Sequence, residues 1–372
     1  MFGIILGLAT IPPPPSPTPH QVLQQLIQKE DTDTLLNRED SLKTLFTDDV
    51  SGQAALAKAQ RRMAYIKAWA AARGFDFKGV TVTVRTGPPH WINPHRIRIY
   101  GAVSARYTYN HRVGNKTPTW FGLGVYHWYT LQDTPLGWRI ADDLFIDPLN
   151  QETRLPGSAT PAPVRISESA RRQALSRGAQ DALNYAAQYC GAAPGCGNQM
   201  RYNPKFEDYN WNGGDCSNFI SQVLKAGGFA ETSTWKWDRH SKEGSPNWVN
   251  ATRLAHFLTD SGRAQIIAHG TFAELAKPVG PEHLSAIHQL QLGDLISYYE
   301  RHRTVHFAIV AGFDPDGYPL VISHSADRFR EPWDLGWDRS TIFYFYRVNY
   351  PKSPSLSTSE NGDRKFADDK SL

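Results

Sequence analysis

The sequence predicts an α+β protein built from two domains. Its 372 residues exceed the ~100 to 200 residues that are usual for one domain. A stretch rich in proline and glycine, residues 150–163, divides the chain near its middle and is predicted to be a linker. On each side of it, helical patterns come first and strand patterns follow, which is typical of α+β domains.

The composition is that of a globular protein without a nucleic-acid partner. Hydrophobic residues make up 40% of the chain, which is enough for a core in each domain. The formal net charge is only +4, and no long run of Lys and Arg is present to follow a phosphate backbone. We therefore do not expect nucleic-acid binding.

The first 19 residues join a short apolar run, Phe2 to Ile11, to a proline-rich segment. The run is too short to cross a bilayer, which needs ~20 apolar residues, so we expect no transmembrane segment. It is similar to the apolar part of a signal peptide, although no basic residues precede it, and the alternative is a disordered tail. With a signal peptide the protein would be secreted or associated with the cell envelope. At the other end, residues 351–372 are polar, rich in Ser and Asp, and predicted to be disordered.

Residues 20–149 are predicted to form the N-terminal domain, with helices first and long antiparallel strands afterwards. Gly74 ends the second helix, and from Arg96 onward hydrophobic and polar residues alternate cleanly. The predicted helices are His20 to Phe46 and Ala54 to Arg73, and the predicted strands are Arg96 to Tyr109, Trp120 to Leu131 and Gly137 to Ile146.

The order of these elements resembles the cone-shaped fold of nuclear-transport-factor-like domains. No acid–base pair and no metal-ligand spacing stands out, and we expect the histidines of this half to be surface or hydrogen-bonded strand residues: His90, His95, His111 and His127. Every candidate catalytic residue lies after the linker. We therefore expect this domain to be dispensable for the chemistry.

Residues 164–350 are predicted to form the second domain, which opens with a helix from Ser167 to Tyr189. Further along, two glycines break the chain, Asp215 can cap a helix, and a new helix runs until Gly227-Gly228. Cys216 falls on the first turn of that helix. The unpaired N–H groups and the helix dipole favour a thiolate there, which would lower the pKa of the thiol as a catalytic cysteine requires.

The other two cysteines, Cys190 and Cys196, flank a flexible Gly-Ala-Ala-Pro-Gly turn. They could close a small disulfide in an oxidising compartment, or remain two free thiols. In the first case Cys216 is the odd thiol of the chain.

A thiol nucleophile needs a histidine that accepts its proton and returns it to the leaving amine. His306 is the best candidate because it lies in a strand pattern, Val305 to Gly312, that follows another strand. His324 ends the next strand pattern. If the connecting loop has an odd number of residues, antiparallel pairing places both histidines on one sheet face, where His324 could orient His306. Ser325 and Asp327 compete for that orienting role.

Several motifs of this half occur together and in a fixed order: Asn203-Pro204, Gly214 to Gln222, Ala226-Gly227-Gly228, Gly293 to Ile296, His306 to Val310, and Ser323 to Arg328. Together they resemble the putative amidase domain of bacterial proteins, a family grouped with papain-like cell-wall endopeptidases. The resemblance implies a papain-like fold in which a helix bearing the nucleophile packs on an antiparallel sheet. It also implies Cys216 as nucleophile, His306 as base and a polar third member, for which we choose His324. No metal and no organic cofactor is implied. The stretch from Cys190 to Cys196 is an insertion relative to the family pattern.

We therefore expect a cysteine amidase or peptidase that hydrolyses an amide bond, with cell-wall peptides of peptidoglycan as the first choice of substrate and a small amide as the second. The alternatives are a binding module of the same fold without turnover, and an acyltransferase. The backbone N–H of Cys216 is a natural oxyanion donor. Side chains that could join it, or bind the substrate, come from the preceding stretch: Tyr209, Asn210, Asn212 and Asp215. Five tryptophans either line the substrate groove or belong to the core: Trp235, Trp237, Trp248, Trp333 and Trp337.

Overall fold

The computed structural model describes residues 17–145, 175–278 and 284–351. The predicted linker, nearly all of the proline-rich start, the first turns of the helix expected from Ser167, and the tail from residue 352 onward lie outside the described residues. Within the described ranges, no helix is long and apolar enough to span a membrane.

The N-terminal helices begin and end largely at the residues that the sequence marks. Thr18 and Gln21 form a capping box at the start of α1, and Asp49 caps α3 through the N–H of Gly52. Gly74 ends α3 in the left-handed conformation, with φ of 71°. The predicted helix from His20 to Phe46 is instead two helices. The bounds are α1 Pro19–Leu35, α2 Glu39–Lys43 and α3 Val50–Arg73.

The strands of this half form long antiparallel pairs. The alternation after Arg96 is confirmed, since Ile97, Ile99 and Tyr109 are fully buried while Arg98 and Arg106 are exposed. The bounds are β1 Phe75–Thr86, β2 His90–Asn93, β3 Arg96–His111, β4 Thr119–Thr134 and β5 Gly137–Phe145.

The C-terminal half combines short helices with a further set of strands. The helices are α5 Arg177–Tyr189, α6 Cys216–Ala226, α7 Pro246–Val249, α8 Ala251–Asp260, α9 Phe272–Leu275 and a 3₁₀ turn at Ala286–Gln289. The main strands are β8 Ala264–Thr271, β9 Leu295–Glu300, β10 Arg303–Phe313, β11 Pro319–Ser323, β12 Asp327–Pro332 and β13 Ile342–Val348, with β6 Trp237–Asp238 and β7 Glu243–Gly244 as a separate pair. This confirms the mixed α+β class with a large antiparallel sheet.

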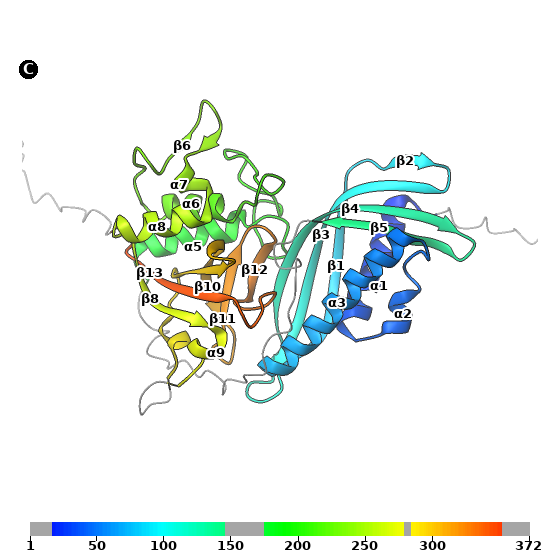
Figure 1. Ribbon diagram of the computed structural model, residues 1–372, viewed down its shortest axis with the longest axis horizontal. Helices are drawn as coiled ribbons and strands as arrows, with labels where there is room; N and C mark the ends of the chain where they lie inside the picture. The colour runs from blue at the N-terminus through cyan, green and yellow to red at the C-terminus, as the bar shows by residue number, and fades with distance from the viewer. Residues whose placement is uncertain (1–16, 146–174, 279–283, 352–372) are drawn as a thin grey trace, which may run out of the picture.

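Among the described residues, the strands of both halves belong to one sheet of 11 strands, with the central order β1-β3-β4-β12-β11-β10-β9-β13-β8. The two halves join where β12 pairs with β4, at Asp327 with Gly124, Arg328 with Leu123 and Phe329 with Gly122. In Figure 1, α5, α6, α7 and α8 gather on one side of the C-terminal strands, and α1 and α3 run across the N-terminal strands.

The core also crosses from one half to the other. One buried cluster includes residues of α1, α3 and β1 together with Tyr298, Trp333 and Phe343 of the C-terminal half. At this junction Trp69 and Arg73 of α3 both bind the buried carboxylate of Asp334, at 3.1 and 2.7 Å. A second cluster lies on the opposite face of the C-terminal strands, under α5, α6 and α8. The N-terminal half therefore packs against one face of the C-terminal strands and shares a core with them.

Candidate functional site

Cys216 is the first residue of α6 and is held there by the preceding loop. Gly213 and Gly214 both have positive φ, 92° and 106°, which lets the chain turn into the helix. Asp215 does not cap the helix with its side chain. Its carboxylate instead accepts from the N–H of Tyr209 at 3.0 Å and from the amide of Asn218 at 2.8 Å. These bonds fix the loop to the first turn of α6.

The thiol of Cys216 lies against the edge of β10. Its Sγ is 4.0 Å from the carbonyl of Val305 and 3.8 Å from Oγ of Ser217, and the N–H of Phe307 donates to it. β11 pairs with β10 only as far as Ile309, so the next part of that edge is left for the start of α6. The sulfur therefore sits beside the backbone on both sides of His306.

The imidazole of His306 is buried among aromatic rings. Its ring lies 5.2 Å from Tyr298 and 5.5 Å from Trp337, and its Nε2 is 3.4 Å from Nη1 of Arg328. Its Nδ1 is buried without a hydrogen-bond partner among the described residues. The hydrogen bonds of the Cys216 sulfur do not include this ring. The structure thus places thiol and imidazole at adjoining positions on β10 without joining them by a hydrogen bond.

His324 does not lie beside His306, contrary to the expectation from the sequence. The connecting loop runs from Asp314 to Tyr318, with an odd number of residues as required, because Phe313 pairs with Pro319. A bulge between Val310 and Gly312 then shifts the register by one residue, so that Ile309 pairs with Ile322. A shift of one residue moves every following side chain to the other face.

His324 consequently packs against the helices on the far face of the sheet from His306. Its ring stacks on Phe219 of α6 at 3.9 Å and lies at a tilt of 31° to Tyr202, with ring centroids 4.2 Å apart. Its Nδ1 is 2.5 Å from the carboxylate of Asp215, and its Nε2 is 2.7 Å from the carbonyl of Tyr189. These contacts join His324 to the loop before Cys216 and to the end of α5, and none of them involves His306.

Of the remaining candidates from the loop, Asn210 and Tyr209 hold it in place. The amide of Asn210 donates to the hydroxyl of Tyr202 at 2.7 Å and its oxygen accepts from Ser325 at 2.6 Å. The Tyr209 hydroxyl accepts from the N–H of Gly244 at 3.2 Å, while Asn212 is exposed. An oxyanion role for any of them stays a prediction.

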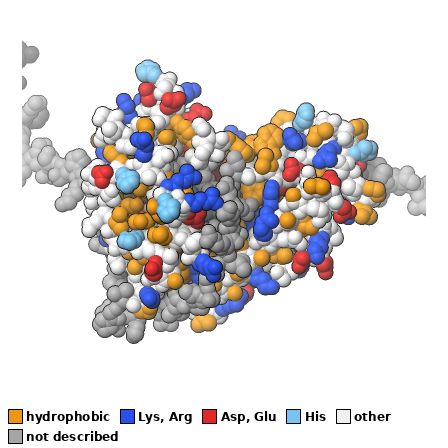
Figure 2. All heavy atoms as spheres, in the orientation of Figure 1, with side chains coloured by type: hydrophobic (Ala, Val, Ile, Leu, Met, Phe, Trp, Pro, Cys, Tyr) orange, Lys and Arg blue, Asp and Glu red, His pale blue; other side chains and the backbone are white. Residues whose placement is uncertain are grey.

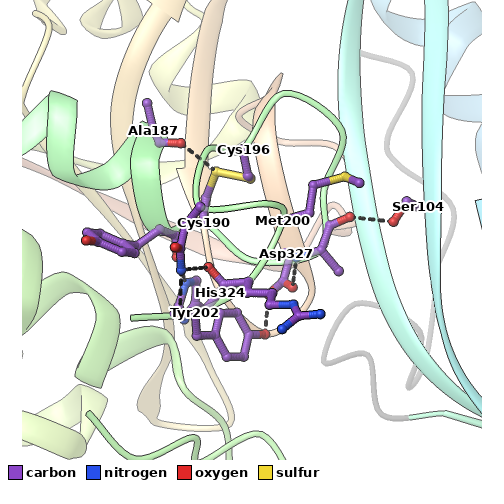
Figure 3. Close-up of a disulfide and its surroundings, with 12 residues drawn as sticks. Ser104, Ala187, Cys190, Cys196, Met200, Tyr202, His324 and Asp327 are labelled. Atoms are coloured by element: carbon purple, nitrogen blue, oxygen red, sulfur yellow. Dashed lines mark hydrogen bonds between the residues drawn. A yellow bond between two sulfur atoms is a disulfide. The ribbon is translucent and has the colours of Figure 1, made fainter. Parts of the chain in front are cut away.

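Cys190 and Cys196 are joined in a disulfide, with Cα atoms 5.4 Å apart. Figure 3 shows the loop that they close, which lies between His324, Asp327 and the N-terminal sheet. Within it, Ala192 donates its N–H to Asp327 and accepts from Ser104 of β3, both at 2.6 Å. The inserted loop therefore ties the N-terminal strands to the segment that carries His324.

Residues 176–346 match the sequence profile of one protein family. The family is described as a putative amidase domain. The resemblance inferred from the motifs is confirmed for the C-terminal half, and the family description implies an amide hydrolase.

No curated protein matches the chain. Among solved structures, the intermembrane space region of the chloroplast protein ARC6 is similar over 35% of this chain and 97% of its own, with 12% identity and a TM-score of 0.25. The Kfla4162 protein from Kribbella flavida is similar over 32% of this chain and 84% of its own, with 16% identity and a TM-score of 0.23. Neither similarity is close enough to assign a fold or a function.

Burial sets the charge states in the amidase domain. It raises the pKa of the Cys216 thiol, and the hydrogen bonds from Ser217 and Phe307 oppose this only in part. The expected lowering by the helix N-terminus is therefore outweighed by the loss of water around the sulfur. Burial, followed by the charge of Arg328, holds the pKa of His306 well below its usual value. Both groups are neutral at neutral pH.

The sequence did not single out Arg328 and Glu331 as site residues. Arg328 is 2% exposed, forms a salt bridge through Nε with Glu331 and reaches His306 with Nη1. The only signal for it was its place at the end of the motif from Ser323 to Arg328. The tryptophans considered for a groove are core residues, each at most 7% exposed: Trp235, Trp237, Trp248, Trp333 and Trp337. The described residues contain no cluster of His, Cys, Asp and Glu that could hold a metal ion.

Proposed function

We propose that the amidase domain hydrolyses amide bonds with Cys216 as nucleophile and His306 as general base. The observation that carries the proposal is the position of the Cys216 sulfur, which contacts the backbone of β10 on both sides of His306. The Nδ1 atom of His306 is buried and has no hydrogen-bond partner among the described residues. A buried imidazole nitrogen without a partner costs stability, so its presence in the strand whose backbone the thiol contacts suggests a catalytic use.

In this reaction the thiol proton passes to His306 while Sγ attacks the substrate carbonyl carbon. The tetrahedral intermediate then collapses to a thioester as the amine departs with the proton from His306. Water, deprotonated by His306, attacks the thioester and releases the acid and the thiol. The N–H of Cys216, at the start of α6, would donate to the oxyanion.

Arg328 sets a condition on this mechanism. A guanidinium can only donate, so where its Nη1 bonds to Nε2 of His306, the proton of the neutral ring resides on Nδ1. To accept a proton at Nδ1, the ring must carry its own proton on Nε2. Nη1 then has to turn away from His306, and Oγ of Ser323 at 3.5 Å is an acceptor toward which it can turn. Substrate binding would trigger that turn.

Peptide bonds of peptidoglycan are the substrate class that we propose, together with an exported location. The disulfide between Cys190 and Cys196 supports export, because such bonds persist in oxidising compartments. A binding module without turnover is the competing function. The absence of a hydrogen bond between the Cys216 sulfur and the His306 ring favours that alternative.

The test is turnover of purified peptidoglycan, followed by mass spectrometry of the released products. Cys216→Ala and His306→Ala should each abolish it, and the double variant should be no slower than either, because nucleophile and base act as a unit. His256→Ala, on the exposed side of α8, is the matched control and should keep full activity. Turnover that survives Cys216→Ala would rule out the thiol mechanism. Binding of peptidoglycan without turnover under any condition would favour the binding module.

A further inference from the structure

Four aromatic side chains form a continuous surface near the loop that leads to Cys216. Tyr100 of β3 and Trp128 of β4 are cross-strand partners, so their side chains share one face of the sheet, and Tyr126 lies on that face as well. Trp211, from the loop before Cys216, approaches Tyr100 with ring centroids 6.3 Å apart. We call Tyr100, Tyr126, Trp128 and Trp211 the aromatic shelf. Figure 2 shows hydrophobic side chains gathered near the top of the junction between the two halves.

The shelf occupies positions where a water-facing strand normally carries polar side chains. Trp128 is 39% exposed and Trp211 is 46% exposed. The middle of the same sheet face is covered, because Ser104 and Gly124 lie against the disulfide loop. The shelf is thus the part of this face that the amidase domain leaves open, and a group of exposed aromatic side chains on a sheet face indicates a binding surface.

Ring geometry and charge limit what the shelf can bind. Tyr100 and Tyr126 are nearly parallel, at 15° and 6.0 Å, whereas Trp128 and Trp211 are tilted to Tyr100 by 42° and 54°, so the two tyrosines supply the parallel ring faces of the shelf. Burial raises the pKa of both tyrosines, and the negative charges of Asp208 and Asp327 raise it further. Such surroundings disfavour a polyanion. A flat, uncharged ligand fits best.

Polar side chains around the aromatic shelf further restrict the class of ligand that it can bind. Asp208 and Asn212 are exposed in the loop that carries Trp211, and Arg98 is exposed on the shelf side of β3. A pyranose ring has an apolar C–H face that packs on an aromatic ring, and its hydroxyl groups point outward toward such donors and acceptors. Neither a lipid chain nor an apolar peptide side chain would use them.

We propose that the aromatic shelf binds sugar rings of a glycan, and that the substrate of the amidase domain is a peptide attached to that glycan. The second part rests on the proposed function. The loop from Tyr209 to Asp215 connects the two sites, because Trp211 lies within it and Asp215 fixes it to the start of α6. A glycan on the shelf would therefore present its attached peptide to Cys216.

The binding test titrates the full chain with an N-acetylglucosamine tetramer and with peptide-free glycan strands, using tryptophan fluorescence and calorimetry. Trp128→Ala and Trp211→Ala should each weaken binding about fivefold or more, the loss expected for one well-packed aromatic contact. Trp91→Ala is the matched control, since Trp91 is 50% exposed and packs on Trp138 away from the shelf. Wild-type affinity in both shelf variants, or no binding of either glycan, would overturn the proposal. So would tighter binding of a sugar-free stem peptide that depends on the same two tryptophans.

Turnover of intact peptidoglycan is compared with turnover of sugar-free stem peptides. This comparison tests the glycan role separately from the test of the proposed amide hydrolysis. Trp128→Ala should lower kcat/KM on intact peptidoglycan more than on sugar-free stem peptides, by the factor lost in glycan binding. Equal losses on both substrates would contradict a glycan role. If Cys216→Ala stays active, the proposed thiol chemistry is wrong. The glycan titration still tests, independently of that result, whether the aromatic shelf binds sugar rings.

Discussion

His306 and His324 lie near each other in the chain, both fully buried, yet their surroundings are opposite. His324 uses both ring nitrogens, one with the carboxylate of Asp215 and one with the carbonyl of Tyr189. Two acceptors require two ring protons, so His324 is an imidazolium in an ion pair. His306 has a cationic neighbour and one nitrogen without a partner. The partners of a buried histidine, and not its burial alone, therefore decide whether its pKa is raised or lowered.

The largest difference between substitutions of His306 and of His324 should be in turnover. His306→Gln should lower kcat/KM by about 100-fold or more, the usual contribution of a general base. The same variant should change the free energy of unfolding little, because no strong hydrogen bond of the ring is lost. Steady-state kinetics and urea unfolding on one preparation give both values. A large loss of stability with retained turnover would exchange the roles of the two histidines.

The second difference should be in stability. His324→Ala should lower the free energy of unfolding by about 3 to 5 kcal/mol, because it leaves the Asp215 carboxylate buried without its cation. Urea unfolding measures this, with His256→Ala as the exposed control. Asp215→Asn combined with His324→Gln should recover part of the loss, since it removes both charges. An effect of His324→Ala no larger than that of the control would show that the ion pair is not structural.

The two histidines should also give stability opposite dependences on pH. Burial lowers the pKa of His324, but the hydrogen bond and charge of Asp215 outweigh it and raise the pKa. Its contribution is therefore full below about pH 6.5 and is lost as the pH rises through the raised value. The pKa of His306 is lowered, so stability is lost as the pH falls below about 6.5.

Unfolding free energies between pH 5 and 8 check this prediction. His324→Gln should flatten the loss on the alkaline side and His306→Gln the loss on the acid side. Burial raises the pKa of Asp327 to about 7, so Asp327 acts in the same direction as His324. The charge of His324 also lowers the pKa of Asp327, so the difference between wild type and His324→Gln contains the change at Asp327 as well. Parallel curves for wild type and both variants would contradict the assigned charge states.

The smallest effect should come from Arg328. Activity requires neutral His306, so kcat/KM rises with pH through the pKa of that group. Arg328→Gln removes a positive charge beside the ring and should raise this pKa, which moves the acid limb of the pH profile to higher pH. Glu331→Gln in the same chain avoids leaving its carboxylate unpaired. Arg303→Gln, on an exposed position of β10, is the control and should not move the limb.

Periodicity and helix signals predicted much of the fold. The stop at Gly74 and the alternation from Arg96 onward were enough to place α3 and β3. The relation between His306 and His324 could not be predicted, because one bulge in β10 reverses the face, and Gly312 beside it marks a place where a bulge can form without showing that one does. The prediction of a lowered pKa for the Cys216 thiol was wrong for a related reason. The helix start is visible in the sequence, whereas the burial that outweighs it depends on how α6 packs against β10.

The linker likewise suggested that the N-terminal half is separable, although β12 pairs with β4 across the junction. The aromatic shelf could not be predicted from the sequence either. Its residues come from three segments, β3, β4 and the loop before Cys216, and Tyr100 had no signal of its own beyond the outward face of its strand.

The pairing of β12 with β4 has a consequence for any shortened form of the protein. β4 covers the outer backbone of β12 at Asp327, Arg328 and Phe329. Without the N-terminal strands, β12 would become an edge strand with unpaired N–H and C=O groups. Such an edge pairs readily with another chain, and natural proteins protect it with charges, prolines or a covering segment. Pro332 blocks only the far end of β12. The N-terminal half therefore covers a strand edge that would otherwise be open to pairing with another chain.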